Sequence, residues 1–380
     1  MKRVLLLSTV HPSTDPRIVY KIAPALARHY EVVLALPGLL PQDQAGVSAV
    51  IKLPRFRRLL FRLFLCHPVV LWKCLRLRPA VVHIFVPELI PIAFLFHVFG
   101  AQVVYEIQEN LYKKFALKRY NNGFIFRYFF RLFDHIARQN FHCIFTEDAY
   151  RAEYKKLRYP SAVVHNYADL CFLNSLPAPT APFNERPFFI YNGVISLERS
   201  FDTLVEALAL LITTYPAVQV HLYGSTQLSV AEMEALPHFK AVRSHLIFHG
   251  YTDQRIALGQ AHKAIAGLAL LKPVGDYPDS YTTKLFEYMA LGLAVVTSDF
   301  PLYEQVVETH GCGFCVSPYD ARALSEKLRW LIEHPAERHR MGIQGREAVK
   351  NKYNWTSEER ILLGYYHAIL EGDSFIESRI

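Results

Sequence analysis

The chain has 380 residues, of which 52% are hydrophobic and 20% are charged. This composition is too apolar for a disordered protein, and the length exceeds what one hydrophobic core usually organises, so we expect two domains. The formal net charge is +8, and its distribution is uneven. Residues 1–165 hold 24 Lys and Arg against 10 Asp and Glu, whereas the rest of the chain holds 18 against 24. The positive charge therefore belongs to the first half.

The first half alternates short apolar runs with helical patterns. The expected strands are 4–7, 32–36, 81–85, 103–107 and 143–146, and the expected helices lie near 18–29 and 91–99. Continuous apolar strands that alternate with helices indicate a parallel sheet covered on both faces. The apolar start of the chain lacks a cleavage site for a signal peptide, and no window has the character of a membrane span. We therefore expect a cytoplasmic protein.

Two basic stretches interrupt this pattern. Residues 51–78 contain eight Lys and Arg and no acid, and residues 113–138 contain seven basic residues with one acid, Asp134. In a helical arrangement Arg55, Arg58 and Arg62 share one face, and apolar side chains share another. This pattern is typical of a helix on an anionic membrane surface, which places the protein at the inner face of the cell membrane. The alternatives are helices whose apolar faces join their own core, and a nucleic-acid site, for which no binding motif is present.

The second half repeats the alternation after a proline-rich break. The expected strands are 188–191, 219–223, 246–248, 266–271 and 294–297, with helices near 203–213 and 284–291. The sequence therefore predicts an α/β protein with two doubly wound parallel-sheet domains whose strand ends face a cleft. The predicted boundaries are an N-terminal, membrane-facing domain over 1–170, a linker over 171–187, a ligand-binding domain over 188–350 and a terminal helix over 351–380 that packs back on the N-terminal domain.

A helix start in the second half carries the residues best suited to bind a ligand. The residues at this start are Ser280, Tyr281, Thr282 and Thr283. Free amides and the positive end of the helix dipole favour phosphate there, and Lys284 adds a positive charge. One turn later, Glu287 can accept hydrogen bonds from two adjacent hydroxyl groups, as a ribose presents them. Together these residues predict a nucleotide site.

The same block resembles the signature of retaining GT-B glycosyltransferases of family 4, also called glycosyl transferase group 1. In that family an E-x7-E motif places one carboxylate on the donor sugar and one on the ribose, and the spacing here falls on Asp279 and Glu287. The stretch 191–200 is similar to the family's glycine loop. The resemblance assigns Gly193 to that loop and the contact with the diphosphate to Arg199.

The first half adds further likenesses, which extend the resemblance from about residue 4 to residue 370. The loop with His11, Asp15 and Arg17 is similar to the family's first loop, which faces the acceptor and the donor phosphates. Gln108 stands where the family often has a His, next to Glu109, which we count among the candidate catalytic residues with Asp279, Arg199 and Lys284.

We therefore expect a retaining hexosyltransferase that moves a sugar from a nucleotide diphosphate donor to a membrane-associated glycan or lipid-linked acceptor, in bacterial-type polysaccharide or glycolipid synthesis. No metal or other cofactor is expected, since the cationic residues can stabilise the leaving diphosphate. The expected partners are the donor, the acceptor and an anionic membrane surface, with no nucleic acid. Two alternatives stay open: a catalytically weakened scaffold subunit of a glycan assembly complex, and a nucleotide-sugar epimerase of the same fold.

Overall fold

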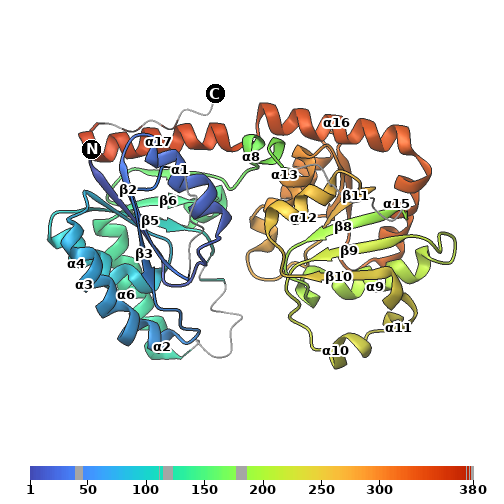
Figure 1. Ribbon diagram of the computed structural model, residues 1–380, viewed down its shortest axis with the longest axis horizontal. Coiled ribbons are helices and arrows are strands. Elements are labelled where there is room, and N and C mark those ends of the chain that lie inside the picture. The colour runs from blue at the N-terminus through green and yellow to red at the C-terminus, as the bar shows by residue number, and fades with distance from the viewer. Residues whose placement is uncertain are drawn as a thin grey trace. The chain divides into compact units, whose positions relative to one another are not determined.

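The computed structural model describes residues 1–38, 46–110, 112–113, 123–176, 186–373, 375 and 377, without the side chains of 124–126. The chain forms two compact units, each built around one sheet (Figure 1). The first comprises Met1–Asn166 and Trp355–Ile380, and the second comprises Tyr167–Asn354.

The first unit contains a parallel sheet in the order β3-β2-β1-β4-β5-β6-β7. Its strands are β1 (Arg3–Leu7), β2 (Glu31–Pro37), β3 (Ala49–Leu53), β4 (Val81–Ile84), β5 (Gln102–Ile107), β6 (His142–Phe145) and β7 (Ser161–Val163). The strand order reverses between β1 and β4. At such a switch point the carboxyl ends of the strands leave room for polar side chains.

Helices cover both faces of this sheet. One layer consists of η1 (Ile18–Ile22), α1 (Ala23–Ala27) and α17 (Trp355–Glu371), and the other consists mainly of α2 (Leu59–Phe61), η2 (Arg62–Cys66), α3 (His67–Cys74), α4 (Ile90–Val98) and α6 (Phe124–Asn140). The alternation of side chains along β1 explains the two layers. Val4 and Leu6 pack with the first layer, and Leu5 and Leu7 pack with the second.

The second unit has the sheet order β10-β9-β8-β11-β12-β13, again with parallel pairing throughout. Its strands are β8 (Phe188–Asn192), β9 (Gln219–Tyr223), β10 (Leu246–Gly250), β11 (Ala266–Ala269), β12 (Ala294–Ser298) and β13 (Gly313–Val316). One face packs against α9 (Phe201–Leu211), α11 (Phe239–Val242) and α15 (Ala321–Glu333), and the other packs against α12 (Gln254–Ala261), α13 (Thr283–Ala290), α14 (Pro301–Val307) and α16 (Pro335–Asn351).

The structure differs from the sequence-based expectations at the margins of the sheets. β3, β7 and β13 were not predicted, and all three lie at or next to a sheet edge, where strands are short and less apolar. Part of the predicted linker is helical, because Leu170–Asn174 forms α8 and Leu173 is buried in a core of the second unit. Residues 177–185 of that linker lie outside the described residues.

Candidate functional site

The candidate site of the second unit lies at the carboxyl ends of β8 and β11, where the strand order reverses. Two loops meet there, one after β8 and one that leads from β11 into α13. The amide of Asn192 donates a hydrogen bond to the Tyr288 hydroxyl at 2.8 Å, and the amide of Lys272 donates to the carbonyl of Glu198 at 2.8 Å. These bonds hold both loops against α13 and its neighbours.

Gly193 lies in the loop after β8, next to two cationic side chains. Its φ of +139° favours glycine. A Cβ at this position would lie 3.0 Å from Nη1 of Arg199 and 3.1 Å from Nζ of Lys284. The glycine therefore lets two cationic side chains approach the same piece of backbone, which is the requirement of a site for a multiply charged anion.

Lys284 is the most unusual residue of the site. Its side chain is buried, and Nζ has no hydrogen-bond partner within the part of the chain that the structure describes. The ammonium group lies 4.0 Å from the centre of the Tyr191 ring. Burial, followed by the charge of Arg199, holds the pKa of Lys284 well below its usual range, although Glu287 acts in the opposite direction. A buried ammonium group without a partner is costly, so the arrangement favours a bound anion.

The N-terminus of α13 lies beside this ammonium group in the sequence. Thr282 occupies the N-cap position, and its side chain makes no capping hydrogen bond. The first turn of the helix also contains no acidic residue. Tyr281, Thr282 and Thr283 are all half-buried. Since a helix N-terminus attracts anions, this end of α13 adds to the positive potential of Lys284 and Arg199.

Glu287 is buried on the same helix, one turn after Lys284. Its Oε1 accepts a hydrogen bond from the amide group of Gln254, the first residue of α12. Sequence reasoning missed Gln254, because no local signal connects it with a carboxylate 33 positions further along the chain. Gln254 therefore contributes to the orientation of this carboxylate.

Asp279 and Ser280 lie on the loop that precedes α13. Asp279 ends the short 3-10 helix η7 (Tyr277–Asp279) and is half-buried. The Ser280 hydroxyl donates to the carbonyl of Asp276 at 2.9 Å, and the Ser280 carbonyl accepts from the Tyr303 hydroxyl at 3.0 Å. The loop is therefore held by its own hydrogen bonds, and it brings Asp279 into the same segment as the helix start.

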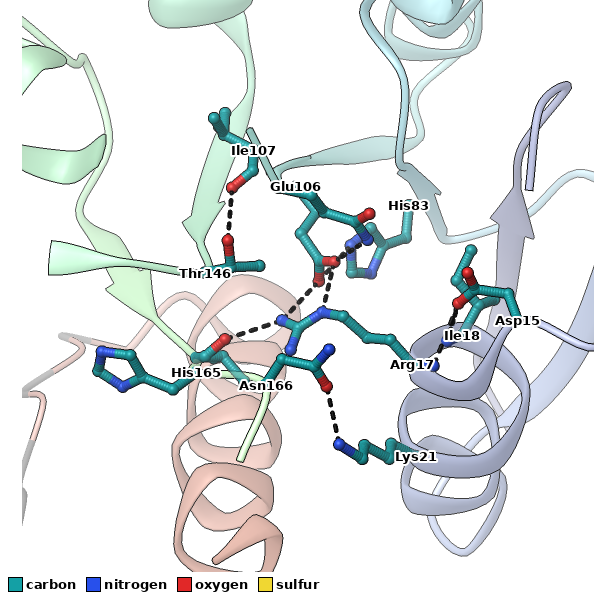
Figure 2. A network of polar contacts seen from close by, with 12 residues as sticks. Asp15, Arg17, Ile18, Lys21, His83, Glu106, Ile107, Thr146, His165 and Asn166 are labelled. Carbon is teal, nitrogen blue, oxygen red and sulfur yellow. Dashed lines mark hydrogen bonds and ion pairs between the residues drawn. The ribbon is translucent and has the colours of Figure 1, made fainter. Parts of the chain in front are cut away.

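In the first unit, a buried polar network occupies the carboxyl ends of the strands (Figure 2). Arg17 is 4% exposed and pairs with Glu106, with 2.8 Å between Nε and Oε1. Its guanidinium group also donates to the carbonyl of Val164 at 2.8 Å. Burial raises the pKa of Glu106, but the charge of Arg17 and the neighbouring His83 ring, whose Nε2 lies 3.5 Å from Oε2, hold this pKa well below its usual range. This burial differs from the acceptor-facing position expected for Arg17.

The other predicted residues of the first unit surround this network. Asp15 accepts the backbone amides of Arg17 and Ile18 at 3.1 and 2.9 Å, so its carboxylate stabilises the start of η1 (Figure 2). Gln108 donates to Oε1 of Glu106 at 2.6 Å. His11 is half-buried with Nδ1 2.8 Å from the Ser8 hydroxyl, and Glu109 is exposed on the loop after β5.

We predicted that Arg55, Arg58 and Arg62 share one face of a helix on the membrane surface, and this prediction is wrong for Arg62. Its guanidinium group forms a two-point ion pair with Glu88, at 2.7 and 2.8 Å, with side-chain exposures of only 15% and 9%. The reason is that the segment is not one regular helix: α2 begins only at Leu59, and Arg58 before it has extended backbone, with φ −86° and ψ 134°, so Arg55 and Arg58 lie outside the helix that the prediction assumed. Arg55 and Arg58 are exposed.

Two general findings concern the described residues as a group. The described residues contain no group of three or more His, Cys, Asp or Glu side chains that could hold a metal ion. In the same set of residues, no helix combines the length and the hydropathy needed to cross a bilayer.

Comparison with known proteins connects the site with a family. Residues 175–348 match the family model described as Glycosyl transferases group 1. This segment contains Gly193, Arg199, Lys284 and Glu287, so the geometry described above falls within the matching domain.

Two curated relatives match part of the chain. A D-inositol 3-phosphate glycosyltransferase of Xylanimonas cellulosilytica is 25% identical over 48% of this chain, and the D-rhamnosyltransferase WbpZ of Pseudomonas aeruginosa is 27% identical over 41%. The chain spans 42% and 38% of the length of these two relatives.

Solved structures match over nearly the whole chain. A sucrose-phosphate synthase of Thermosynechococcus elongatus has a TM-score of 0.74 and 18% identity, over 98% of this chain and 100% of that one. Anabaena Alr3699/HepE in complex with UDP-glucose has a TM-score of 0.71 and 13% identity, over 97% and 100%. The predicted fold is confirmed: both units are parallel-sheet α/β domains, and the fold is that of GT-B glycosyltransferases.

Proposed function

We propose that this protein is a glycosyltransferase that uses a nucleotide diphosphate sugar as its donor. The observation that carries the proposal is the buried ammonium group of Lys284 at the glycine loop of Gly193, for which the described residues provide no hydrogen-bond partner. Arg199 reaches the same point of the loop, and α13 begins beside it. The diphosphate of a donor supplies the negative charge that this arrangement lacks. The match to Glycosyl transferases group 1 and the UDP complexes of a structural neighbour support the same assignment.

The described residues divide the work of such a reaction. In glycosyl transfer, the bond between the anomeric carbon and the diphosphate breaks, and an acceptor hydroxyl forms the new bond and gives up its proton. Arg199 and Lys284 stabilise the charge that develops on the leaving diphosphate, so the proposal needs no metal ion. Glu287, oriented by Gln254, receives the ribose hydroxyls, and Asp279 receives the donor sugar. We propose a retaining, hexosyl-transferring reaction on the basis of the Asp279–Glu287 spacing.

The proposed acceptor is a membrane-associated glycan or lipid-linked sugar, and the proposed location is the cytoplasmic face of the membrane. The cationic first unit supports this part of the proposal, since an anionic bilayer attracts such a unit. Of the acceptor-side candidates, His11, Asp15 and Gln108 are half-buried, and Glu109, a candidate catalytic residue, is exposed. Arg17 acts as a positioning residue there, because its ion pair with Glu106 ties the first loop to β5.

Donor turnover tests the proposal directly. The chain is incubated with UDP-, GDP- and TDP-sugars, and release of the nucleotide diphosphate is measured with and without EDTA. We expect slow release from one donor class, insensitive to EDTA and lowered about 100-fold or more by Arg199→Ala, the scale of losing one charge stabiliser. A protein that binds a nucleotide diphosphate but releases none from any donor would instead be the scaffold alternative. A protein that binds none of them would end the proposal.

A further inference from the structure

The second helical layer of the first unit presents an unusual outer face. α4 and α6 pack against each other, and Val70 of α3, Phe96 of α4 and Ala137 of α6 point into one core beneath the sheet. Figure 1 shows α3, α4 and α6 together on one flank of this unit. The exposed large apolar side chains of this layer are Leu60, Phe61, Phe64, Leu65, Trp72, Leu95, Val98, Phe99, Tyr128, Phe129 and Leu132. They are half of the exposed large apolar side chains that the structure describes.

This exposure belongs to one layer and is not a general property of the unit. η1, α1 and α17, which cover the opposite face of the same sheet, expose no large apolar side chain among their described residues. α4 shows the contrast best. It is apolar on nearly every side, which is expected of a helix that is covered on all sides, yet Val98 is 64% exposed and Phe99, directly after it, is 71% exposed. Single exposed apolar residues need no explanation, but a concentration of this kind marks an interaction surface.

The charged residues of the layer are almost entirely basic. Its exposed basic side chains are Arg55, Arg57, Arg58, Lys73, Arg76, Arg127 and Arg131. The acids nearby are neutralised within the fold, since Asp134 is buried and pairs with Arg138, and Glu88 pairs with Arg62. The face therefore combines apolar side chains with a net positive charge among its described residues.

We propose that this face docks on an anionic lipid bilayer. The docking face comprises the exposed side chains of 55–76, 95–99 and 127–132. Its apolar side chains enter the boundary between headgroups and acyl chains, and its basic side chains contact the lipid phosphates. Charge decides between a bilayer and a second copy of the chain, because an isologous dimer would bring the same cationic face against itself. The inference rests on the proposed function in one respect, since a bilayer-bound acceptor requires such a surface.

Two variants of the docking face test the proposal, each with a matched control in the second unit. The apolar variant is Leu60→Ser with Phe64→Ser and Phe99→Ser, and its control is Leu210→Ser with Val230→Ser and Ile343→Ser, which are also exposed. The charge variant is Arg57→Gln with Arg58→Gln and Arg76→Gln, and its control is Lys240→Gln with Arg322→Gln and Arg340→Gln, all exposed. Because all twelve side chains are exposed, the fold should tolerate each set.

Binding is measured by co-sedimentation with vesicles of phosphatidylglycerol and phosphatidylcholine, and with phosphatidylcholine vesicles alone. We expect the wild type to bind the anionic vesicles at low salt and to leave them at high salt. The charge variant should bind on the order of 100-fold more weakly, since each basic residue near the surface contributes about fivefold. The apolar variant should also bind more weakly, and both controls should bind like the wild type.

Four results would overturn the docking proposal. The wild type could fail to sediment with anionic vesicles, it could bind neutral vesicles equally well, or the controls could lose as much binding as the variants. The fourth is a concentration-dependent dimer, seen by analytical ultracentrifugation, that the docking-face variants abolish. UDP affinity, measured in parallel, separates this proposal from the glycosyltransferase assignment. A wild type that binds UDP but not anionic vesicles refutes docking alone, whereas a wild type that binds none of UDP, GDP and TDP refutes the donor site.

Discussion

Replacing Lys284 with methionine tests whether its buried ammonium group is kept for a ligand. Methionine retains most of the volume and removes the charge. If a diphosphate accepts a charge-assisted hydrogen bond from Nζ, the variant should lose about 1.5–3 kcal/mol of binding, which corresponds to about 10- to 150-fold in Kd. Isothermal titration with UDP, or with the nucleotide diphosphate that the donor screen identifies, measures this loss.

The same variant also allows a prediction about the stability of the ligand-free protein. An unpartnered buried polar group costs about 1–3 kcal/mol, and the contact with the Tyr191 ring at 4.0 Å returns about 0.5–2 kcal/mol of this. The free energy of unfolding of Lys284→Met should therefore change by between about −1 and about +2.5 kcal/mol. For a domain of this size the upper value corresponds to a Tm increase of about 5–10 °C.

Lys327→Met is the matched control. Lys327 also lies over an aromatic ring, that of Phe314 at 4.7 Å, but on a partly exposed position of α15. It should change neither nucleotide affinity nor Tm by more than a small amount. If Lys284→Met loses affinity together with clearly more than about 1 kcal/mol of stability, Lys284 is a structural residue. If its affinity is unchanged, Lys284 lies outside the site.

Three further predictions concern other polar groups. Glu287→Gln should weaken binding of the nucleotide by about 1.5–3 kcal/mol, but it should bind the ribose-free diphosphate with the affinity of the wild type. Equal losses of affinity for both ligands would show that Glu287 does not contact the ribose. Arg17→Met should destabilise the protein by about 3–5 kcal/mol in urea melts, because it removes the ion-pair partner of the buried carboxylate of Glu106. The double variant with Glu106→Gln should recover much of this loss. Additive effects of the two substitutions would contradict the pairing. Although burial opposes its charged form, Asp148 and Glu358 raise the pKa of His165 to about 9. This group therefore stabilises the fold fully below about pH 6.5, and up to about 3 kcal/mol is lost as the pH rises through about 9. His165→Gln should flatten that part of the profile.

The sequence by itself determined the parts of this protein that depend on neighbouring residues. The alternation of apolar strands and helices fixes two parallel sheets, because a strand that is apolar on both faces must be covered on both. The residues proposed to bind the donor could be selected from the sequence, because the helix start with Lys284 and Glu287 is formed by residues close in the chain. Arg199 was selected through the resemblance of 191–200 to a glycine loop. The edge strands were missed because they bury too little to carry a clear pattern.

The tertiary structure decided every property that depends on a distant partner. Arg17 is one example, because its burial depends on Glu106, 89 positions away, and the orientation of Glu287 similarly depends on Gln254. The segment 51–78 is another. Its periodicity shows that an apolar face exists, but only packing against the sheet decides which residues enter the core and which stay exposed. Val70 enters the core, Phe64 does not, and Arg62 pairs with Glu88, which lies 26 positions further along the chain. Burial is a property of the assembled layers, so no local pattern determines it.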